Sequence, residues 1–252
     1  MNMIVPSLTD LHYCTTSYQP KFDSFGNVDI ADLLVSFQKI AGNHVEHLGM
    51  GKEFSEANGF YYILCRIKGY FLAKLKPEET YTFVTYPTMA GALQLYRYAY
   101  LVDSSGNPVF YLLSLWVLMN RETRRLQSAK AFQNKLREML PDIDDVEPLT
   151  DERLYEMDFS NQEFHYDSTY VVHSSDIDSN QHMNNTVYMK IAQEKCILSP
   201  ISVFEIDFEK ECYLHDAITI ETSLNAISYS VMGKKSDGML SFMARFFTSD
   251  NI

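Results

Sequence analysis

The chain has 252 residues, 46% of them hydrophobic, so it is long enough to bury a sizeable core. It carries 33 acidic against 21 basic residues, a net charge of −12, which argues against a nucleic-acid-binding protein. Four widely separated cysteines without a Cys-x-x-Cys pair argue against a zinc or disulfide framework and favour reduced thiols in a cytosol. No signal-peptide pattern opens the sequence, and the longest apolar run, 109–119, is too short for a membrane helix.

The first half of the chain predicts one long helix followed by an antiparallel sheet. Residues 27–51 place apolar side chains at helical spacing, and Gly49 and Gly51 supply the stop signal. A DSSGNP turn at 103–108 predicts a hairpin between the two strands that flank it. The predicted strands cover residues 61–71, 79–89, 93–103 and 109–122.

Charge is unevenly placed in the middle of the chain. Residues 121–137 hold six bases and one Glu, a net of +5, whereas residues 141–158 hold eight acids and one Arg, a net of −7. The acidic stretch contains proline and shows no apolar face, so we interpret it as part of a linker. We therefore expect a first repeat over 1–140, an acidic linker over 141–163 and a second repeat over 164–252.

The second half repeats the order of the first. A helix is expected over 186–198, and registering FQKIA (37–41) on YMKIA (188–192) aligns the two helices without gaps. The strands expected after this helix cover residues 202–212, 216–228, 229–235 and 239–249. One helix followed by an antiparallel sheet, twice over, predicts an α+β duplication in which each sheet wraps around its own helix.

A group of polar side chains precedes the second helix. Asp178, Asn180 and His182 are spaced i, i+2, i+4, so in an extended segment they share one side. The first repeat builds its helix without this set, at the aligned residues 27–31, so the fold does not require it. A carboxylate, an imidazole, an amide and a helix N-terminus are what acyl transfer to water needs. The plainer interpretation makes Asp and Asn helix caps and the histidine a core residue.

Three sequence motifs favour the catalytic interpretation over the structural one. The sequence DIDSNQHMNNTVYMKIAQE (176–194) resembles the signature of acyl-ACP thioesterases, double-hotdog enzymes of plant plastids and bacteria. SLWVLMNRETRRL (114–126) and FEKEC (208–212) resemble two further strands of that family, in the right order. The resemblance implies a tandem hotdog fold and hydrolysis of fatty acyl–acyl carrier protein, which releases free fatty acid and ends chain elongation. Because no plastid transit segment is visible ahead of the domain, we expect a cytoplasmic, bacterial enzyme, and we expect no metal and no cofactor.

Residue by residue, the resemblance implies a catalytic set of Asp178, Asn180, His182 and Glu211. Either a carboxylate, Asp178 or Glu211, activates water together with His182, or Asp178 attacks the thioester directly; Asn180 orients a partner or the water. On strand alternation alone, Glu211 is a solvent-facing acid. Cys212 matches a cysteine of the family, and because no basic neighbour is visible we interpret it as a small buried residue.

The implied partner is acyl carrier protein, which is acidic, and the first repeat is implied to bind the acyl chain. The basic segment supplies candidate docking residues, Arg121, Arg124, Arg125 and Lys130; the alternative is a solvated helix and loop. Two other functions stay open: an acyl-CoA thioesterase, and a non-catalytic fatty-acyl-binding or regulatory protein. Neither nucleic acid nor a membrane is an expected partner. Monomer and homodimer are both open, because a double hotdog supplies internally the pairing that single hotdogs reach by dimerising.

Overall fold

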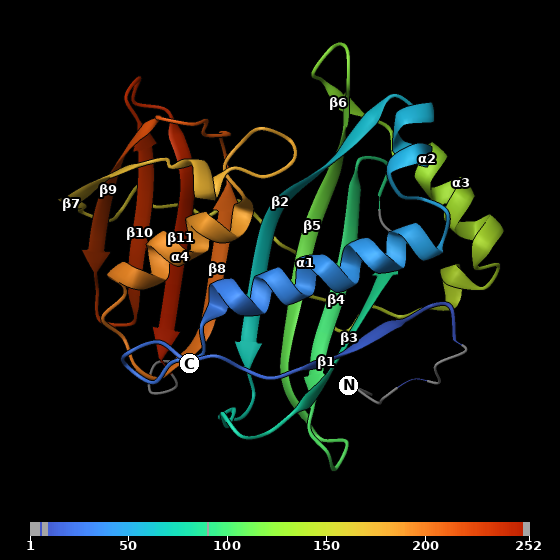
Figure 1. Cartoon of the computed structure of the whole chain (residues 1–252), viewed down its shortest axis with the longest axis horizontal. Coiled ribbons are helices and arrows are strands. Elements are labelled where there is room, and N and C mark those ends of the chain that lie inside the picture. Colours follow the sequence, from blue (N-terminus) through green and yellow to red (C-terminus); the bar gives the residue numbers. More distant parts are fainter. Residues whose placement is uncertain (1–5, 7–9, 90, 249–252) are drawn as a thin grey trace. The chain divides into compact units, whose positions relative to one another are not determined.

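The computed structural model describes residues 6, 10–89 and 91–248. The chain forms two compact units that both combine helices with an antiparallel sheet (Figure 1). Unit 1 consists of residues 1–20, 35–67 and 72–154, and unit 2 of residues 21–34, 68–71 and 155–252. No helix in the described part of the chain is long and apolar enough to cross a membrane.

Unit 1 contains a sheet with the strand order β1–β3–β4–β5–β2, and the short β6 pairs with β5. The pairs β1–β3, β3–β4 and β4–β5 are antiparallel. These strands are β1 (Cys14–Tyr18), β2 (Phe60–Phe71), β3 (Tyr81–Thr88), β4 (Gln94–Val102), β5 (Pro108–Asn120) and β6 (Leu126–Gln127). The helices of this half are α1 (Ile30–His47), α2 (Lys52–Ala57), α3 (Lys130–Met139) and the 3-10 turn η1 (Ile143–Asp145).

The amphipathic helix expected over 27–51 is confirmed as α1, which lies across the strands of unit 1 (Figure 1). Its apolar face includes Leu33, Phe37 and Ile40, at most 2% exposed, and each such side chain contributes about 1.5–3 kcal/mol by leaving water. Gly49 follows the last turn with φ +62°, a conformation that glycine adopts without strain, and so ends the helix.

The hairpin expected at 103–108 is also confirmed, between β4 and β5. Asp103 Oδ1 accepts the N–H groups of Ser105 and Asn107 at 2.9 and 2.8 Å, and Gly106 takes φ +83° inside the turn. The strand that follows is buried on both faces along much of its length, because successive side chains such as Leu112 and Leu113 are both fully buried. The long apolar run is therefore the core strand of unit 1.

Residues 141–163, expected to form an acidic linker, carry buried side chains in both units. Ile143 and Leu154 are 0% and 7% exposed in unit 1, and Met157 and Phe159 are 6% and 9% exposed in unit 2. Apolar residues spaced this irregularly give no periodic face, so composition alone pointed to solvent. The three-part division itself stays a prediction.

Unit 2 contains a sheet with the strand order β8–β11–β10–β9–β7, all four neighbouring pairs antiparallel. Its elements are β7 (His165–Val171), the 3-10 turn η2 (Ser174–Asp176), α4 (Asn185–Lys195), β8 (Ile201–Phe208), β9 (Ala217–Leu224), β10 (Ser228–Lys235) and β11 (Leu240–Thr248). The helix α4 contacts β10 and β11 and covers the sheet of this unit (Figure 1).

One helix followed by an antiparallel sheet, twice over, is thus confirmed as a double hotdog. The sequence did not predict β1 and β7, the end strands of the two sheets. In β7 no residue is buried, so apolar and polar residues do not alternate there and the strand signal is weak.

Candidate active site

The polar residues of 178–182 form a tight turn before α4 and not an extended segment, so the shared side that an extended segment would give them does not apply. The N–H of Asp178 donates to the carbonyl of His182 at 3.0 Å, and Gln181 has φ +69° inside the turn. Asp178 Oδ1 accepts the N–H of Asn180 at 2.7 Å, and Oδ2 lies 3.4 Å from Asn180 Nδ2. Because the turn closes on itself, it still brings the carboxylate and the imidazole together.

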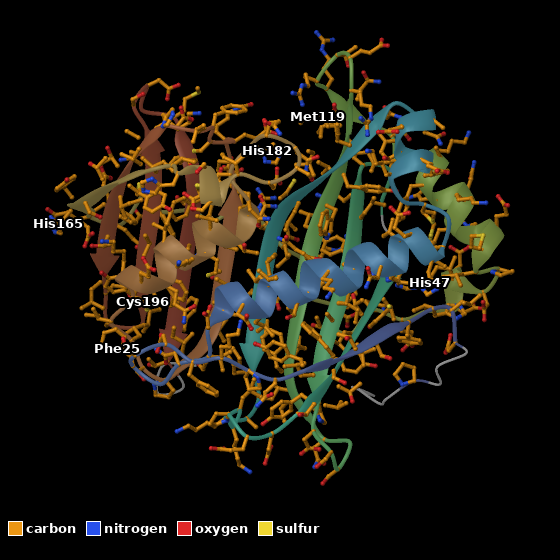
Figure 2. The ribbon with its side chains drawn as sticks, in the orientation of Figure 1. Phe25, His47, Met119, His165, His182 and Cys196 are labelled. Atoms are coloured by element: carbon orange, nitrogen blue, oxygen red, sulfur yellow. The ribbon has the colours of Figure 1, made fainter. Side chains whose placement is uncertain are left out.

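The imidazole of His182 lies between two carboxylates (Figure 2 labels His182). Its Nδ1 is 3.7 Å from Asp178 Oδ2, and its Nε2 is 3.9 Å from Glu211 Oε1. Both distances are longer than a direct hydrogen bond but short enough for an ion pair. Such contacts in a ligand-free site can shorten to hydrogen bonds when substrate binds. The side chains are 23%, 20% and 38% exposed for His182, Asp178 and Glu211, so the group is accessible from outside. In the described residues, no three His, Cys, Asp or Glu side chains are grouped to hold a metal ion.

Glu211 reaches this group because β8 ends before it. The strand stops at Phe208, so strand alternation does not apply to Glu211, and the expectation of a solvent-facing acid was based on a strand that is not there. Glu211 Oε2 accepts the hydroxyl of Tyr213 at 2.8 Å, and its carbonyl accepts Lys235 Nζ at 2.9 Å. The first contact restrains the carboxylate of Glu211, and the second restrains its backbone.

The two segments of the site are joined through the residues beside them. The N–H of Met183 donates to the carbonyl of Cys212 at 2.7 Å, and the N–H of Cys212 donates to the hydroxyl of Tyr188 at 3.0 Å. Tyr188 is 3% exposed and packs edge-on against Phe208 and Phe242. An aromatic side chain of α4 therefore fixes the distance between the turn that carries His182 and the segment that carries Glu211.

Cys212 is a buried residue, as expected, with 0% exposure. Its Sγ lies 3.3 Å from Ser241 Oγ. Burial raises the pKa of the thiol, and the hydrogen bonds with Ser241 and Tyr188 only oppose that effect. A thiol held protonated in this way is a poor nucleophile.

The start of α4 leaves few amide groups for a ligand. Asn184 is the N-cap, and its side chain accepts the N–H of Thr186 at 2.9 Å. The N–H groups of Met183, Asn184 and Val187 are also bonded to protein carbonyls. Asn185 is the position in this run whose N–H has no acceptor among the residues that the structure describes. At the start of α4, the N–H of Asn185 is therefore the one backbone donor of residues 183–187 left to bind an oxyanion.

Sequence reasoning missed a carboxylate that shapes the turn. Asp176 Oδ2 accepts the hydroxyl of Tyr170 at 2.7 Å and the N–H of His173 at 2.8 Å, and its carbonyl accepts the N–H of Asn184 at 2.9 Å. Asp176 stands in the quoted signature, but nothing in its spacing distinguishes it from Asp178. Tyr213 and its bond to Glu211 were missed for the same reason, because a loop tyrosine gives no periodic signal.

The four candidate docking residues lie in unit 1 around β6 and are not equivalent. The side chain of Arg121 makes contacts within unit 1. Its Nε donates to the carbonyl of Phe60 at 2.9 Å, and its guanidinium lies 4.0 Å from the centre of the Tyr61 ring. Arg124, Arg125 and Lys130 are exposed.

Acidic neighbours neutralise part of the positive charge expected over 121–137. Lys135 pairs with Glu138, and Arg137 pairs with Asp144. The net positive charge of this surface is therefore smaller than the count of basic residues in the sequence suggests.

Unit 1 also contains a cavity of about 140 Å³, and its lining is mostly apolar. Side chains of α1, α3 and the strands β2 to β5 form its walls, among them Trp116 and Phe132. Three aromatic residues of the first repeat, Tyr62, Tyr96 and Trp116, line this cavity, whereas Phe37 is fully buried in the core.

The fold and the site can be compared with those of known proteins. The sequence profile of the acyl-ACP thioesterase N-terminal domain matches residues 7–131, and that of the C-terminal domain matches residues 160–243. None of the curated protein sequences matches the chain.

Three solved structures share the fold. An acyl-ACP thioesterase from Bacteroides thetaiotaomicron has a TM-score of 0.80 at 19% identity, covering 94% of this chain and 97% of its own. The 12:0-ACP thioesterase from Umbellularia californica has a TM-score of 0.77 at 18% identity, covering 96% and 98%. An oleoyl thioesterase (putative) from Lactobacillus plantarum has a TM-score of 0.71 at 16% identity, covering 93% and 94%.

The double hotdog fold and the two domain matches define a class of protein, the tandem-hotdog thioesterases. Within it, this chain belongs to the acyl-ACP thioesterase family, whose two domain profiles match it in order over most of its length. That family is one of thioester hydrolases.

Proposed function

We propose that this protein hydrolyses the thioester of fatty acyl–acyl carrier protein, releasing free fatty acid and ending chain elongation. The observation that carries the proposal is His182, held within 4 Å of both Asp178 and Glu211 at an accessible position. An imidazole with a carboxylate at each ring nitrogen can take a proton and keep the resulting charge stabilised. The free cysteines of the chain suit a reducing cytosol as the compartment.

In the reaction we propose, His182 and Glu211 share the attacking water. Their atoms are 3.9 Å apart, so one water oxygen can lie at hydrogen-bond distance, ~2.8 Å, from both. Asp178 accepts the Nδ1 proton of His182 and thereby leaves Nε2 free to take the proton of the water. Asn180 holds Asp178 in place through its two hydrogen bonds.

The bond changes then balance without any further reactant. The water oxygen bonds to the thioester carbon as its proton passes to His182, and the carbonyl oxygen becomes an oxyanion. The N–H of Asn185 supplies a donor for that oxyanion at the positive end of α4. When the intermediate collapses, the carbon–sulfur bond breaks and His182 returns its proton to the leaving sulfur, which gives a carboxylic acid and a free thiol.

The substrate's other parts are assigned to unit 1. We place the acyl chain in its apolar cavity and acyl carrier protein on the exposed bases Arg124, Arg125 and Lys130. An acidic carrier that approaches a chain of net charge −12 needs such a local patch of opposite sign.

Free-thiol release from medium- and long-chain acyl-ACPs, with the matching acyl-CoAs in parallel, tests the proposal. Asp178→Asn and His182→Ala are each expected to lower kcat by roughly 10²–10⁴-fold, the usual contribution of a general base. His165→Ala is the matched control, because His165 is an exposed histidine of the same unit outside the site (Figure 2).

The outcomes separate the candidate functions. Turnover of acyl-ACPs well ahead of acyl-CoAs supports the proposal, and equal or faster CoA turnover makes the protein an acyl-CoA thioesterase. Tight acyl binding without thiol release from either carrier makes it a binding protein. A folded Asp178→Asn or His182→Ala variant that keeps most of its activity overturns the site.

A further inference from the structure

The wall of the cavity in unit 1 includes a buried, positively charged side chain. Arg97, on β4, lines the cavity and is 6% exposed. Burial lowers its pKa to about 10, so the guanidinium remains protonated at neutral pH. A buried charge in an apolar wall is costly to the fold unless a partner compensates it. Among the residues that the structure describes, no carboxylate forms an ion pair with Arg97.

Arg97 is instead held by two neutral acceptors on one of its nitrogens. Nη1 lies 3.2 Å from His44 Nδ1 and 3.3 Å from Thr85 Oγ1. His44 Nε2 faces the carbonyl of Leu11 at 2.9 Å; since a carbonyl only accepts, Nε2 carries the proton and Nδ1 is the acceptor. Thr85 donates its own proton to the carbonyl of Tyr98 at 2.9 Å and accepts from Arg97. Neither partner neutralises the positive charge.

The other edge of the guanidinium, Nε and Nη2, makes no hydrogen bond to the residues that the structure describes. That edge offers two parallel N–H groups, the fork that matches an oxygen acceptor and best matches a carboxylate. Because Arg97 lines the cavity, a plain hydrocarbon chain that fills it brings no acceptor to these donors and excludes the water that could serve them. Such a loss of hydrogen bonds at a charged group opposes binding.

We propose that this cavity selects acyl chains that carry an oxygen acceptor near their distal end, and that Arg97 recognises this oxygen. The inference rests on the proposed function, and it names the substrate class: acyl thioesters ending in a carboxylate, or bearing a hydroxyl or keto oxygen, in preference to saturated hydrocarbon chains. A cavity of ~150 Å³ holds a guest the size of benzene, so the oxygen belongs within roughly the last six atoms of the chain.

The test compares acyl-ACPs of equal length that end either in a methyl group or in an oxygen-bearing group. For wild type we expect kcat/KM to favour the oxygenated chain by roughly tenfold to a hundredfold, the range of one hydrogen bond to a charged group. Carboxylate-, hydroxyl- and keto-bearing chains run as separate arms, and their order identifies the preferred oxygen group. Methyl-ended chains reacting as fast as every oxygenated arm in wild type overturn the inference.

Two variants assign the preference to Arg97. Arg97→Met removes the donors and is expected to abolish the preference, whereas Arg97→Lys keeps the charge without the fork and is expected to retain part of it. Gln38→Met is the matched control, since Gln38 also lines the cavity with a polar side chain, but a neutral one. Loss of the preference in Gln38→Met, with Arg97→Met unchanged, transfers the role to Gln38 and overturns the assignment.

A binding arm keeps this inference separate from hydrolysis. S-alkyl pantetheine thioethers, one ending in methyl and one in carboxylate, are titrated into wild type and the same variants by calorimetry. Tighter binding of the carboxylate-ended thioether without thiol release from any acyl-ACP refutes the proposed function and leaves the cavity assignment standing. Thiol release from acyl-ACP with equal binding of both thioethers supports the proposed function and refutes the assignment of the cavity.

Discussion

Replacing His44 by glutamine is expected to remove a large part of the acid sensitivity of unit 1. His44 lies on α1 with 2% exposure, donates to Leu11 and accepts from Arg97. Burial, and next the charge of Arg97, lower its pKa from 6.5 to about 4. Glutamine provides one acceptor and one donor group, the two roles of the neutral imidazole, and it does not titrate.

The magnitude follows from the two pKa values. Between pH about 6.5 and about 4 the unfolded chain binds a proton at His44 that the folded chain does not, so the free energy of unfolding falls as the pH falls. One pKa unit corresponds to ~1.4 kcal/mol, so the full effect is about 3 kcal/mol. Between pH 7 and pH 4.5 it amounts to about 2.5 kcal/mol. The stability is present above pH 6.5 and is lost as the pH falls towards 4.

Urea unfolding at the two pH values measures this loss, followed by the fluorescence of Trp116. Trp116 is the one tryptophan of the chain and belongs to unit 1, so its signal reports that unit. The loss of stability on acidification should be smaller in His44→Gln than in wild type by about 2.5 kcal/mol. His165→Gln, which changes an exposed histidine of unit 2, should match wild type. Parallel losses in wild type and His44→Gln would refute a neutral, buried His44.

Three further changes test the site and its surface. Tyr213→Phe removes the 2.8 Å hydrogen bond to Glu211, and because both side chains are partly exposed we expect kcat to fall only ~3- to 10-fold, with KM little changed. Cys212→Ser should retain most of the thiol-release activity, since burial raises the pKa of the thiol, and a loss beyond ~100-fold in a folded variant would restore it as a nucleophile. Arg125→Glu combined with Lys130→Glu should raise KM for acyl-ACP about tenfold at low salt while leaving acyl-CoA turnover unchanged; equal effects on both carriers would argue against a docking patch.

The sequence by itself determined the repeat and the residues of the turn. The apolar spacing of α1, the DSSGNP hairpin and the match of the two helices gave the helix-then-sheet order twice, because these signals are local and periodic. Asp178, Asn180 and His182 were identified from a short run of polar residues, and their proximity follows from a turn closed within five positions.

Tertiary structure decided what lies across from that turn. Glu211 approaches His182 because β8 ends early and because Tyr188 and the carbonyl of Cys212 join the two segments, contacts between residues far apart in the sequence. Likewise, in the sequence Arg97 is only one polar residue among the aromatic residues of a strand. The packing of the fold is what places its charge in the wall of an apolar cavity. Local periodicity specifies which face an element buries, whereas the partners of a buried polar group depend on long-range pairing that one stretch of sequence does not encode.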